Sequence, residues 1–314
     1  MLRIIFMGTP EFAVPSLESI VSQGYKVVAV VTPPDKPAGR GRKVTPCAVK
    51  TAAITLNLPL LQPEKLRDQD FINTLTELKP DIMVVVAFRM LPKVVWSIPK
   101  KGAFNLHSSL LPNYRGAAPM NHAIINGETE SGITTFLLDE EIDTGKILFQ
   151  EKVDISNTMN VGDLHDLLMI KGADLVIQTL ESLEKGTYQP IPQPTEILNP
   201  KAAPKFIKED LRINWNSSAH EIYNFIRGLS PYPTAFTSFI SPEGKAYPIK
   251  IYQAQISDMM VEKGTIFTDN KKILVIKCGC GAIQINEIQL SGKKKMIIAE
   301  FLRGFPITNN WSVK

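Results

Sequence analysis

The sequence predicts an α/β protein in which a doubly wound, mostly parallel sheet is followed by a small C-terminal barrel of short strands. Three observations support this prediction. Apolar, β-branched runs alternate with segments of helical period up to about residue 184. Residues 82–87 are apolar without interruption, which is typical of a strand covered on both faces. After a proline-rich stretch, short apolar runs recur at regular spacing between turn residues.

The first strand, helix and strand are predicted over residues 2–7, 10–23 and 26–32. Within the helix, apolar residues such as Leu17 and Ile20 recur at roughly helical spacing. Elements of this length form a right-handed βαβ unit, so the two strands are expected to be parallel.

The same alternation continues through the rest of this half. Further helices are predicted over 47–57, 71–78, 118–126 and 161–184, and further strands over 81–87, 103–107, 132–139 and 146–154. The last helix carries an apolar stripe that includes Leu164, Leu168 and Leu175. Strands and helices in this order give one doubly wound domain.

The composition changes near residue 188, where five prolines fall within nineteen residues. Because proline does not fit inside helices or central strands, residues 190–206 are interpreted as a stiff linker between domains of residues 1–189 and 207–314. The second domain is predicted to contain a helix over 218–228 and strands over 235–240, 248–256, 264–268, 273–277 and 283–290. This set favours a small open barrel, of a kind that often binds oligonucleotides.

The composition is that of a globular protein, since 44% of the residues are apolar and 21% are charged. No apolar run is long enough to span a bilayer, and the first residues have the pattern of a strand rather than a signal peptide. The three cysteines, Cys47, Cys278 and Cys280, have no histidine cluster nearby and favour a reducing compartment without a metal site. We therefore expect a cytosolic protein with no bound metal.

Charge is distributed unevenly along the chain. Residues 1–200 carry 19 Lys and Arg against 22 Asp and Glu, net −3, whereas residues 201–314 carry 16 against 9, net +7. A basic C-terminal part suggests a domain that meets a polyanion, with an ordinary lysine-rich surface as the alternative.

The candidate catalytic residues are Asn105, His107 and Asp143. Asn105 and His107 lie two residues apart at the end of a predicted strand, so their side chains should point to the same side. An amide can donate to a developing oxyanion, an imidazole can donate a proton to that oxygen or to a leaving nitrogen, and a carboxylate can orient the imidazole. The alternative for His107 is a hydrogen-bonded core histidine. Active sites of such sheets, however, lie beyond the carboxyl ends of the strands.

The stretch from Asn105 to Pro119 reads NLHSSLLPNYRGAAP and, together with Asp143-Thr144-Gly145, resembles the signature of the formyltransferases that use 10-formyltetrahydrofolate. The start of the chain, the loop over residues 35–43 and the pieces near Trp215 and Arg227 also resemble this family. The resemblance implies a Rossmann-like formyltransferase domain followed by an OB-like barrel. It also implies catalysis by the three residues named above and transfer of the formyl group to the methionine amine of charged initiator tRNA. We expect a monomer that uses 10-formyltetrahydrofolate as its co-substrate.

The same resemblance implies two folate-binding loops. One follows the Asn-Leu-His strand and contributes Ser109, Leu110, Leu111 and Pro112. The other, over residues 87–92, is one residue shorter than is usual in the family and would line the pteridine end through Phe88, Met90 and Leu91.

Two basic segments are the expected tRNA contacts. Arg40, Arg42 and Lys43 lie in the loop with which the family grips the acceptor arm, and Lys293, Lys294 and Lys295 lie in the basic barrel. Arginines spaced by glycines suit close approach to phosphates and bases. A solvated loop and a solvated turn are the respective alternatives.

Two other functions share parts of this pattern. A formyltransferase acting on a small amine, such as glycinamide ribonucleotide or an amino sugar nucleotide, would have the same catalytic residues but no need of a basic barrel. A non-catalytic RNA-binding protein built on the same fold would be expected to have a damaged catalytic set, whereas all three residues are present here.

Overall fold

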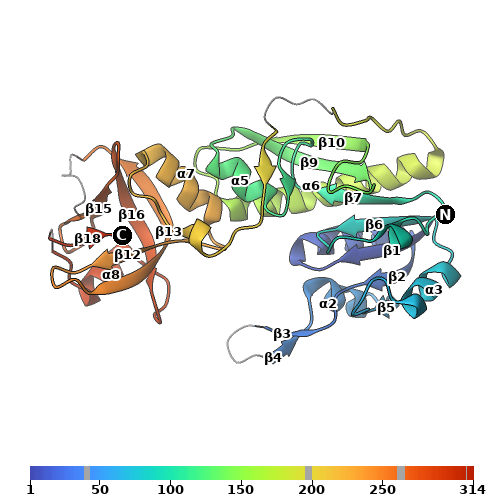
Figure 1. Ribbon diagram of the computed structural model, residues 1–314, viewed down its shortest axis with the longest axis horizontal. Coiled ribbons are helices and arrows are strands. Elements are labelled where there is room, and N and C mark those ends of the chain that lie inside the picture. Colours follow the sequence, from blue (N-terminus) through green and yellow to red (C-terminus); the bar gives the residue numbers. More distant parts are fainter. Residues whose placement is uncertain (39–42, 195–199, 260–265, 309) are drawn as a thin grey trace. The chain divides into compact units, whose positions relative to one another are not determined.

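The computed structural model describes the chain except for residues 39–42, 195–199, 260–265 and 309 (Figure 1). The chain forms two compact units, each assembled from three segments. Unit 1 comprises Met1–Gly116, Ser131–Val153 and His165–Ala202, and unit 2 comprises Ala117–Glu130, Asp154–Leu164 and Ala203–Lys314. Among the described residues, no helix combines the length and the apolar character needed to cross a membrane.

Unit 1 is built on a seven-stranded sheet with the strand order β10-β9-β7-β6-β1-β2-β5 (Figure 1). The strands are β1 (Arg3–Gly8), β2 (Lys26–Val31), β5 (Leu60–Leu61), β6 (Ile82–Val86), β7 (Ala103–His107), β9 (Glu130–Leu137) and β10 (Ile147–Asp154). Neighbours from β5 to β7 pair in parallel, whereas β7 and β9 are antiparallel. The prediction of a mostly parallel, doubly wound sheet is confirmed.

The strand order reverses between β1 and β6, because the chain first moves outward to β2 and β5 and then returns past β1. In sheets of this kind ligands bind beyond the carboxyl ends of the strands next to such a reversal. Central strands β1 and β6 are buried almost throughout, with Met7 and Met83 fully enclosed. The uninterrupted apolar run in β6 is explained by this position, since both faces of the strand are covered.

Helices accompany the sheet in the predicted order. They are α1 (Val14–Ser22), preceded by the 3-10 turn η1 (Glu11–Ala13), α2 (Ala48–Thr55), α3 (Gln69–Glu77) and α6 (Val161–Lys185), and the short helix α4 (Lys93–Trp96) comes in addition. Helix α3 begins two residues before the predicted start because the Asp68 side chain accepts from the backbone amides of Asp70 and Phe71. Phe71 and Leu75 then face the core.

Several short elements of unit 1 were not predicted, because two to four residues are too few to show a period. They are the edge strand β5, the helix α4, the hairpin of β3 (Lys36–Ala38) with β4 (Lys43–Thr45), and the pair of β8 (Arg115–Gly116) with β11 (Ala202–Ala203).

Unit 2 contains the predicted small barrel. Its strands are β12 (Ala235–Ile240), β13 (Ala246–Ser257), β14 (Ile266–Thr268), β15 (Leu274–Lys277), β16 (Ala282–Leu290), β17 (Met296–Ile297) and β18 (Ser312–Val313), and the pairs with a described register are antiparallel. The barrel nearly closes where the Ile266 amide donates to the Trp311 carbonyl at 3.4 Å. Side chains such as Ile249, Ile251 and Ile285 fill its interior.

Helices α7 (Ala219–Leu229), α8 (Ile298–Gly304) and the turn η2 (Glu209–Leu211) complete this end of the chain; α8 was not predicted. Helix α7 starts at a capping box, in which Ser218 and Glu221 bind each other's backbone amides. It packs against α5 (Pro119–Ile125), as Figure 1 shows. The Asn121 side chain donates to the Gly228 carbonyl at 2.8 Å. A Cβ at Gly228 would lie 2.6 Å from Ile125 Cγ1, so only glycine permits this close approach.

Candidate active site

Strand β7 presents Asn105 and His107 on one side, as the alternation of strand side chains predicts. Its register against the antiparallel strand β9 places Asn105 opposite Phe136 and His107 opposite Thr134. Asn105 is half-buried and His107 is 6% exposed, so both groups lie at the carboxyl edge of the sheet with little access to water.

Both ring nitrogens of His107 face protein groups. Nε2 lies 2.9 Å from the Tyr114 carbonyl oxygen, and because a carbonyl only accepts, Nε2 must carry the proton of this hydrogen bond. Nδ1 lies 3.8 Å from Asp143 Oδ2, which is an ion-pair distance rather than a hydrogen bond. The edge of the ring meets Phe136, with 6.4 Å between ring centroids. A proton taken up at Nδ1 would therefore face a carboxylate.

Asp143 sits in the connection between β9 and β10, with a left-handed backbone φ of 57°. Its Oδ2 accepts from the Gly116 amide at 3.0 Å, which fixes the carboxylate on the side of His107. The connection lies very close to β9: a Cβ at Gly145 would come within 1.6 Å of the Leu137 carbonyl oxygen. Glycine at this position is thus required for Asp143 to reach the imidazole.

The side-chain oxygen of Asn105 is buried and has no hydrogen-bond partner among the described residues. Leaving a buried polar atom unpaired destabilises a fold by about 1–3 kcal/mol. Such atoms in native proteins call for an explanation, and a catalytic role is one of them. Asn105 therefore has a side-chain oxygen without a partner among the described residues, on the same side of β7 as His107.

Gln193 and Arg115 belong to this site although sequence reasoning did not select them. The Gln193 amide nitrogen donates to the carbonyls of Asp143 at 2.9 Å and Gly145 at 2.8 Å. Its oxygen accepts from Arg115 Nη2 at 2.6 Å and Nε at 3.2 Å. Gln193 lies in the stretch interpreted as a linker, so that stretch also fastens the Asp143 turn. No feature of the sequence around Gln193 indicates this contact.

The expected folate loop after β7 is held by its own polar groups. The Ser109 hydroxyl donates to the Asn113 carbonyl at 2.7 Å, and the Ser109 carbonyl accepts from Thr134 Oγ1 at 2.6 Å. Leu111 is 3% exposed and packs against Phe136. Leu110 and Pro112 are half-buried. The side chains of Ser109 and Leu111 thus stabilise the turn, and those of Leu110 and Pro112 are more accessible to a ligand.

The second expected folate loop follows β6. Leu91 is buried, Phe88 packs partly against the same core, and Met90 is 70% exposed. Arg89 anchors the loop by donating to the carbonyls of Pro63 at 2.6 Å and Glu64 at 3.0 Å. Burial lowers the pKa of the Arg89 guanidinium from its ordinary value.

The expected tRNA contacts are described only in part. Arg40 and Arg42 lie outside the described residues, and Lys43 belongs to β4, whose backbone pairs with Ala38. Lys293, Lys294 and Lys295 form an exposed turn in unit 2, after β16. Lys295 is partly neutralised there, since its Nζ lies 2.9 Å from Glu287 Oε2 and 5.2 Å from the centre of the Tyr252 ring.

Among the described residues, no three His, Cys, Asp or Glu side chains lie close enough together to hold a metal ion. The groups brought together at the edge of unit 1 are an amide, an imidazole and a carboxylate. They can stabilise an oxyanion and move a proton.

Comparison with known proteins identifies the family. The Formyl transferase family profile matches residues 2–180, and the profile of its C-terminal domain matches residues 205–306. The methionyl-tRNA formyltransferase of Bacteroides thetaiotaomicron is 49% identical over 99% of this chain and 98% of its own length. The enzyme of the same name from Flavobacterium johnsoniae is 48% identical over 99% of each chain.

Solved structures share the fold at lower identity. An N-formyltransferase from Helicobacter canadensis, in complex with folinic acid and dTDP-3-aminofucose, has a TM-score of 0.68 at 22% identity, covering 94% of this chain and all of its own. HypX from Aquifex aeolicus, in complex with tetrahydrofolic acid, has a TM-score of 0.64 at 17% identity, covering 96% of this chain and 47% of its own. From the two profile matches and the full-length relatives, this chain belongs to the formyl transferase family.

Proposed function

We propose that this protein transfers the formyl group of 10-formyltetrahydrofolate to the amino group of the methionine carried by initiator tRNA. In this reaction the amine nitrogen attacks the formyl carbon, a new C–N bond forms, and the bond to N10 of the folate breaks. The amine loses one proton and N10 gains one, so the transfer needs no net acid or base.

The observation that carries the proposal is the position of Asn105, which lies on the same side of β7 as His107, the partner of Asp143. A formyl carbonyl develops a negative oxygen when the amine attacks, and an amide donor held in place before reaction stabilises that charge. The unprotonated Nδ1 of His107 can accept the proton that the amine sheds, and Asp143, whose Oδ2 lies 3.8 Å from Nδ1, stabilises the resulting imidazolium. All of these steps use groups of this chain.

The choice of acceptor rests on different observations. The relatives at 48–49% identity that cover nearly the whole chain carry the name methionyl-tRNA formyltransferase. The net charge of +7 over residues 201–314 also suits a polyanionic substrate. We assign the tRNA contacts to Arg40, Arg42 and Lys43 and to the Lys293–Lys295 turn, and the folate contacts to the loops after β6 and β7.

Transfer to an amino sugar nucleotide is the second candidate, favoured by the likeness to sugar formyltransferases of known structure. That likeness lies at 18–22% identity and extends to the fold alone. The tRNA acceptor is therefore the better supported of the two.

The test is to incubate the purified protein with methionyl-tRNA and 10-formyltetrahydrofolate and to measure the mass of the aminoacyl group after release. Glycinamide ribonucleotide and a dTDP-amino sugar serve as competing acceptors in parallel. Formylation of methionine with neither small amine modified is expected. His107→Ala should keep its fold and tRNA binding but lose nearly all turnover, and wild-type turnover in this variant would exclude the mechanism.

We further propose that the enzyme works in the cytosol as a monomer, in keeping with its reducing-compartment cysteine content. Light scattering of the purified protein would test the oligomeric state.

A further inference from the structure

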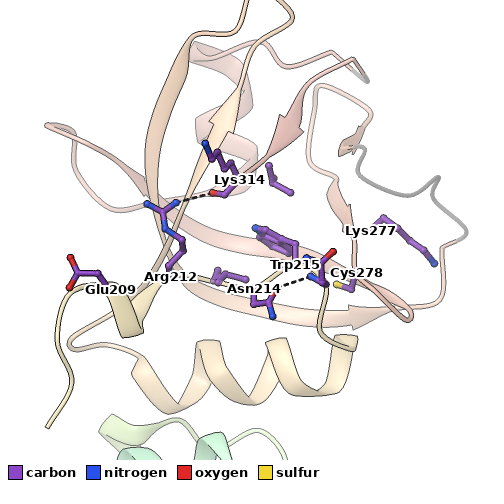
Figure 2. A pocket seen from close by; sticks show the side chains of 10 residues that line it. Glu209, Arg212, Asn214, Trp215, Lys277, Cys278 and Lys314 are labelled. Carbon is purple, nitrogen blue, oxygen red and sulfur yellow. Dashed lines mark hydrogen bonds between the residues drawn. The ribbon is translucent and has the colours of Figure 1, made fainter.

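A cavity of about 590 Å³ lies in unit 2, where the segment after η2 meets the barrel. Figure 2 shows Trp215 on its wall, between Arg212 and Lys277, with Lys314 and Asn214 also lining it. The volume falls within the range of small-ligand sites. None of these residues takes part in the site on unit 1.

The wall of the cavity is built from two interlocked turns. The Gly279 amide donates to the Ser217 carbonyl at 2.9 Å, and the Ala219 amide donates to the Cys280 carbonyl at 2.8 Å. A Cβ at Gly279 would lie 1.9 Å from the Asn216 carbonyl oxygen, so no other residue allows the turns to meet. The Cys278-Gly279-Cys280 motif is explained by this contact. These contacts hold the two turns of the wall together.

Side chains on the wall are held in place in the same way. The Trp215 indole donates from Nε1 to Thr237 Oγ1 at 2.9 Å. The Arg212 guanidinium stacks 4.9 Å from the centre of the Phe236 ring and donates from Nη1 to the Lys314 carbonyl at 3.3 Å. Asn214 Oδ1 accepts from the Asn216 amide at 3.1 Å.

The charges of the lining favour an anionic ligand with a planar group. Arg212, Lys277 and Lys314 supply three cationic side chains, and Glu209 supplies one carboxylate. Cys278 is not a thiolate there, because burial raises the pKa of its thiol to about 11. Cationic side chains near an aromatic ring are the combination with which proteins bind unpaired nucleotides, the base against the ring and the phosphates against the cations.

We propose that this cavity is a nucleotide-binding groove for an unpaired stretch of RNA, with one base against Trp215 and its flanking phosphates bound by Arg212 and Lys277. The inference rests on the proposed function, since tRNA is the RNA that the enzyme would hold. It adds a defined contact to the barrel, distinct from the lysine turn over residues 293–295.

The first test compares Lys277→Glu with Lys272→Glu. Both change the net charge equally, but Lys277 is the last residue of β15, whereas Lys272 is an exposed residue in the turn before that strand. Binding of tRNA is measured by fluorescence anisotropy over a series of salt concentrations. Lys277→Glu is expected to weaken binding about tenfold at low salt and to lower the salt slope by about one, and Lys272→Glu by less than about twofold. Equal effects of the two variants would overturn the proposal.

The second test asks whether a base stacks on the indole. A short single-stranded RNA should quench tryptophan fluorescence of the whole protein, and Trp215→Phe should abolish most of the quenching while Trp96→Phe does not. Quenching that persists in Trp215→Phe would overturn the proposed stacking. Thermal unfolding of each variant verifies that it is folded.

Formylation by the wild-type protein is measured on the same preparations. If the wild type formylates methionyl-tRNA but the two lysine variants bind RNA equally well, the proposed groove is refuted and the proposed function is not. Selective loss of binding in Lys277→Glu without any formylation by the wild type would support the groove and refute the proposed function.

Discussion

Replacing Gln193 should disturb the candidate active site without touching any residue that contacts substrate in our proposal. Gln193 is 7% exposed, and its amide fastens the Asp143 turn to Arg115. Gln193→Ala removes two hydrogen bonds to backbone carbonyls and two from a guanidinium. The Asp143 turn then loses its two hydrogen bonds from the Gln193 side chain.

The expected size of the effect follows from these contacts. Neutral hydrogen bonds contribute about 0.5–1.5 kcal/mol each and bonds to a charged group about 1.5–3 kcal/mol. Water can enter the space left by the side chain, so we expect a loss of about 2–4 kcal/mol for unit 1 rather than the full sum. Displacing a positioning group by about 1 Å can reduce turnover by about 100-fold, so kcat should fall by about 10- to 100-fold.

The assay combines thermal unfolding with initial rates of methionyl-tRNA formylation at saturating substrates. Gln189→Ala, an exposed glutamine four residues earlier, is the control and should resemble the wild type. Gln193→Glu is more informative than alanine, because it keeps the acceptor for Arg115 but places a carboxylate oxygen against the carbonyls of Asp143 and Gly145. It should reduce kcat at least as much as Gln193→Ala. Wild-type kcat and unfolding temperature in both Gln193 variants would refute the reasoning.

Three further predictions follow from other groups. Asn105→Ala should lower kcat by about 100- to 1000-fold, as expected for loss of the amide nitrogen as an oxyanion donor. The unfolding temperature should stay nearly unchanged, because Asn105 Oδ1 has no hydrogen-bond partner among the described residues; a large drop would show that the residue is structural. The pKa of Asp269 is lowered from 3.8 to about 2 by backbone amides, first that of Ile273, so its stabilising effect is complete above pH about 4 and is lost as the pH falls toward 2. Between pH 5 and pH 2.5 the free energy of unfolding, measured by denaturant titration, should therefore fall more steeply for the wild type than for Asp269→Asn. Parallel pH dependences of the two proteins would contradict this. Iodoacetamide at pH 8 should alkylate the exposed Cys280 but spare the buried Cys278, whose thiol has a pKa near 11; mass spectrometry of peptides separates the two sites, and equal labelling would disprove the burial argument.

The sequence predicts those parts of the fold that depend on local pattern. The apolar run of β6 identifies a central strand, and the two-residue spacing of Asn105 and His107 places both side chains on one face of β7. These inferences succeed because the period of a strand and the burial of its faces can be inferred from residues that are adjacent in the sequence.

Contacts between distant residues could not be predicted in this way. Gln193 bonds to carbonyls 48 and 50 residues away, and nothing in its neighbourhood distinguishes it from other polar residues of a proline-rich stretch. Ser109 and Leu111 remain predicted folate contacts, and the structure adds what the sequence does not indicate: the Ser109 hydroxyl donates to the Asn113 carbonyl, and Leu111 packs against Phe136. Sequence pattern indicates that a loop matters, and tertiary contacts decide which of its atoms are free.

The packing of α5 against α7 can form only late in the synthesis of the protein on the ribosome. Asn121 and its partner Gly228 are 107 residues apart, so α5 leaves the ribosome long before the helix that covers it has been made. Until then the face around Ile125 has no partner from α7. For the same reason a fragment starting at residue 206 would lack α5, and RNA-binding measurements on the barrel are better made with the intact polypeptide.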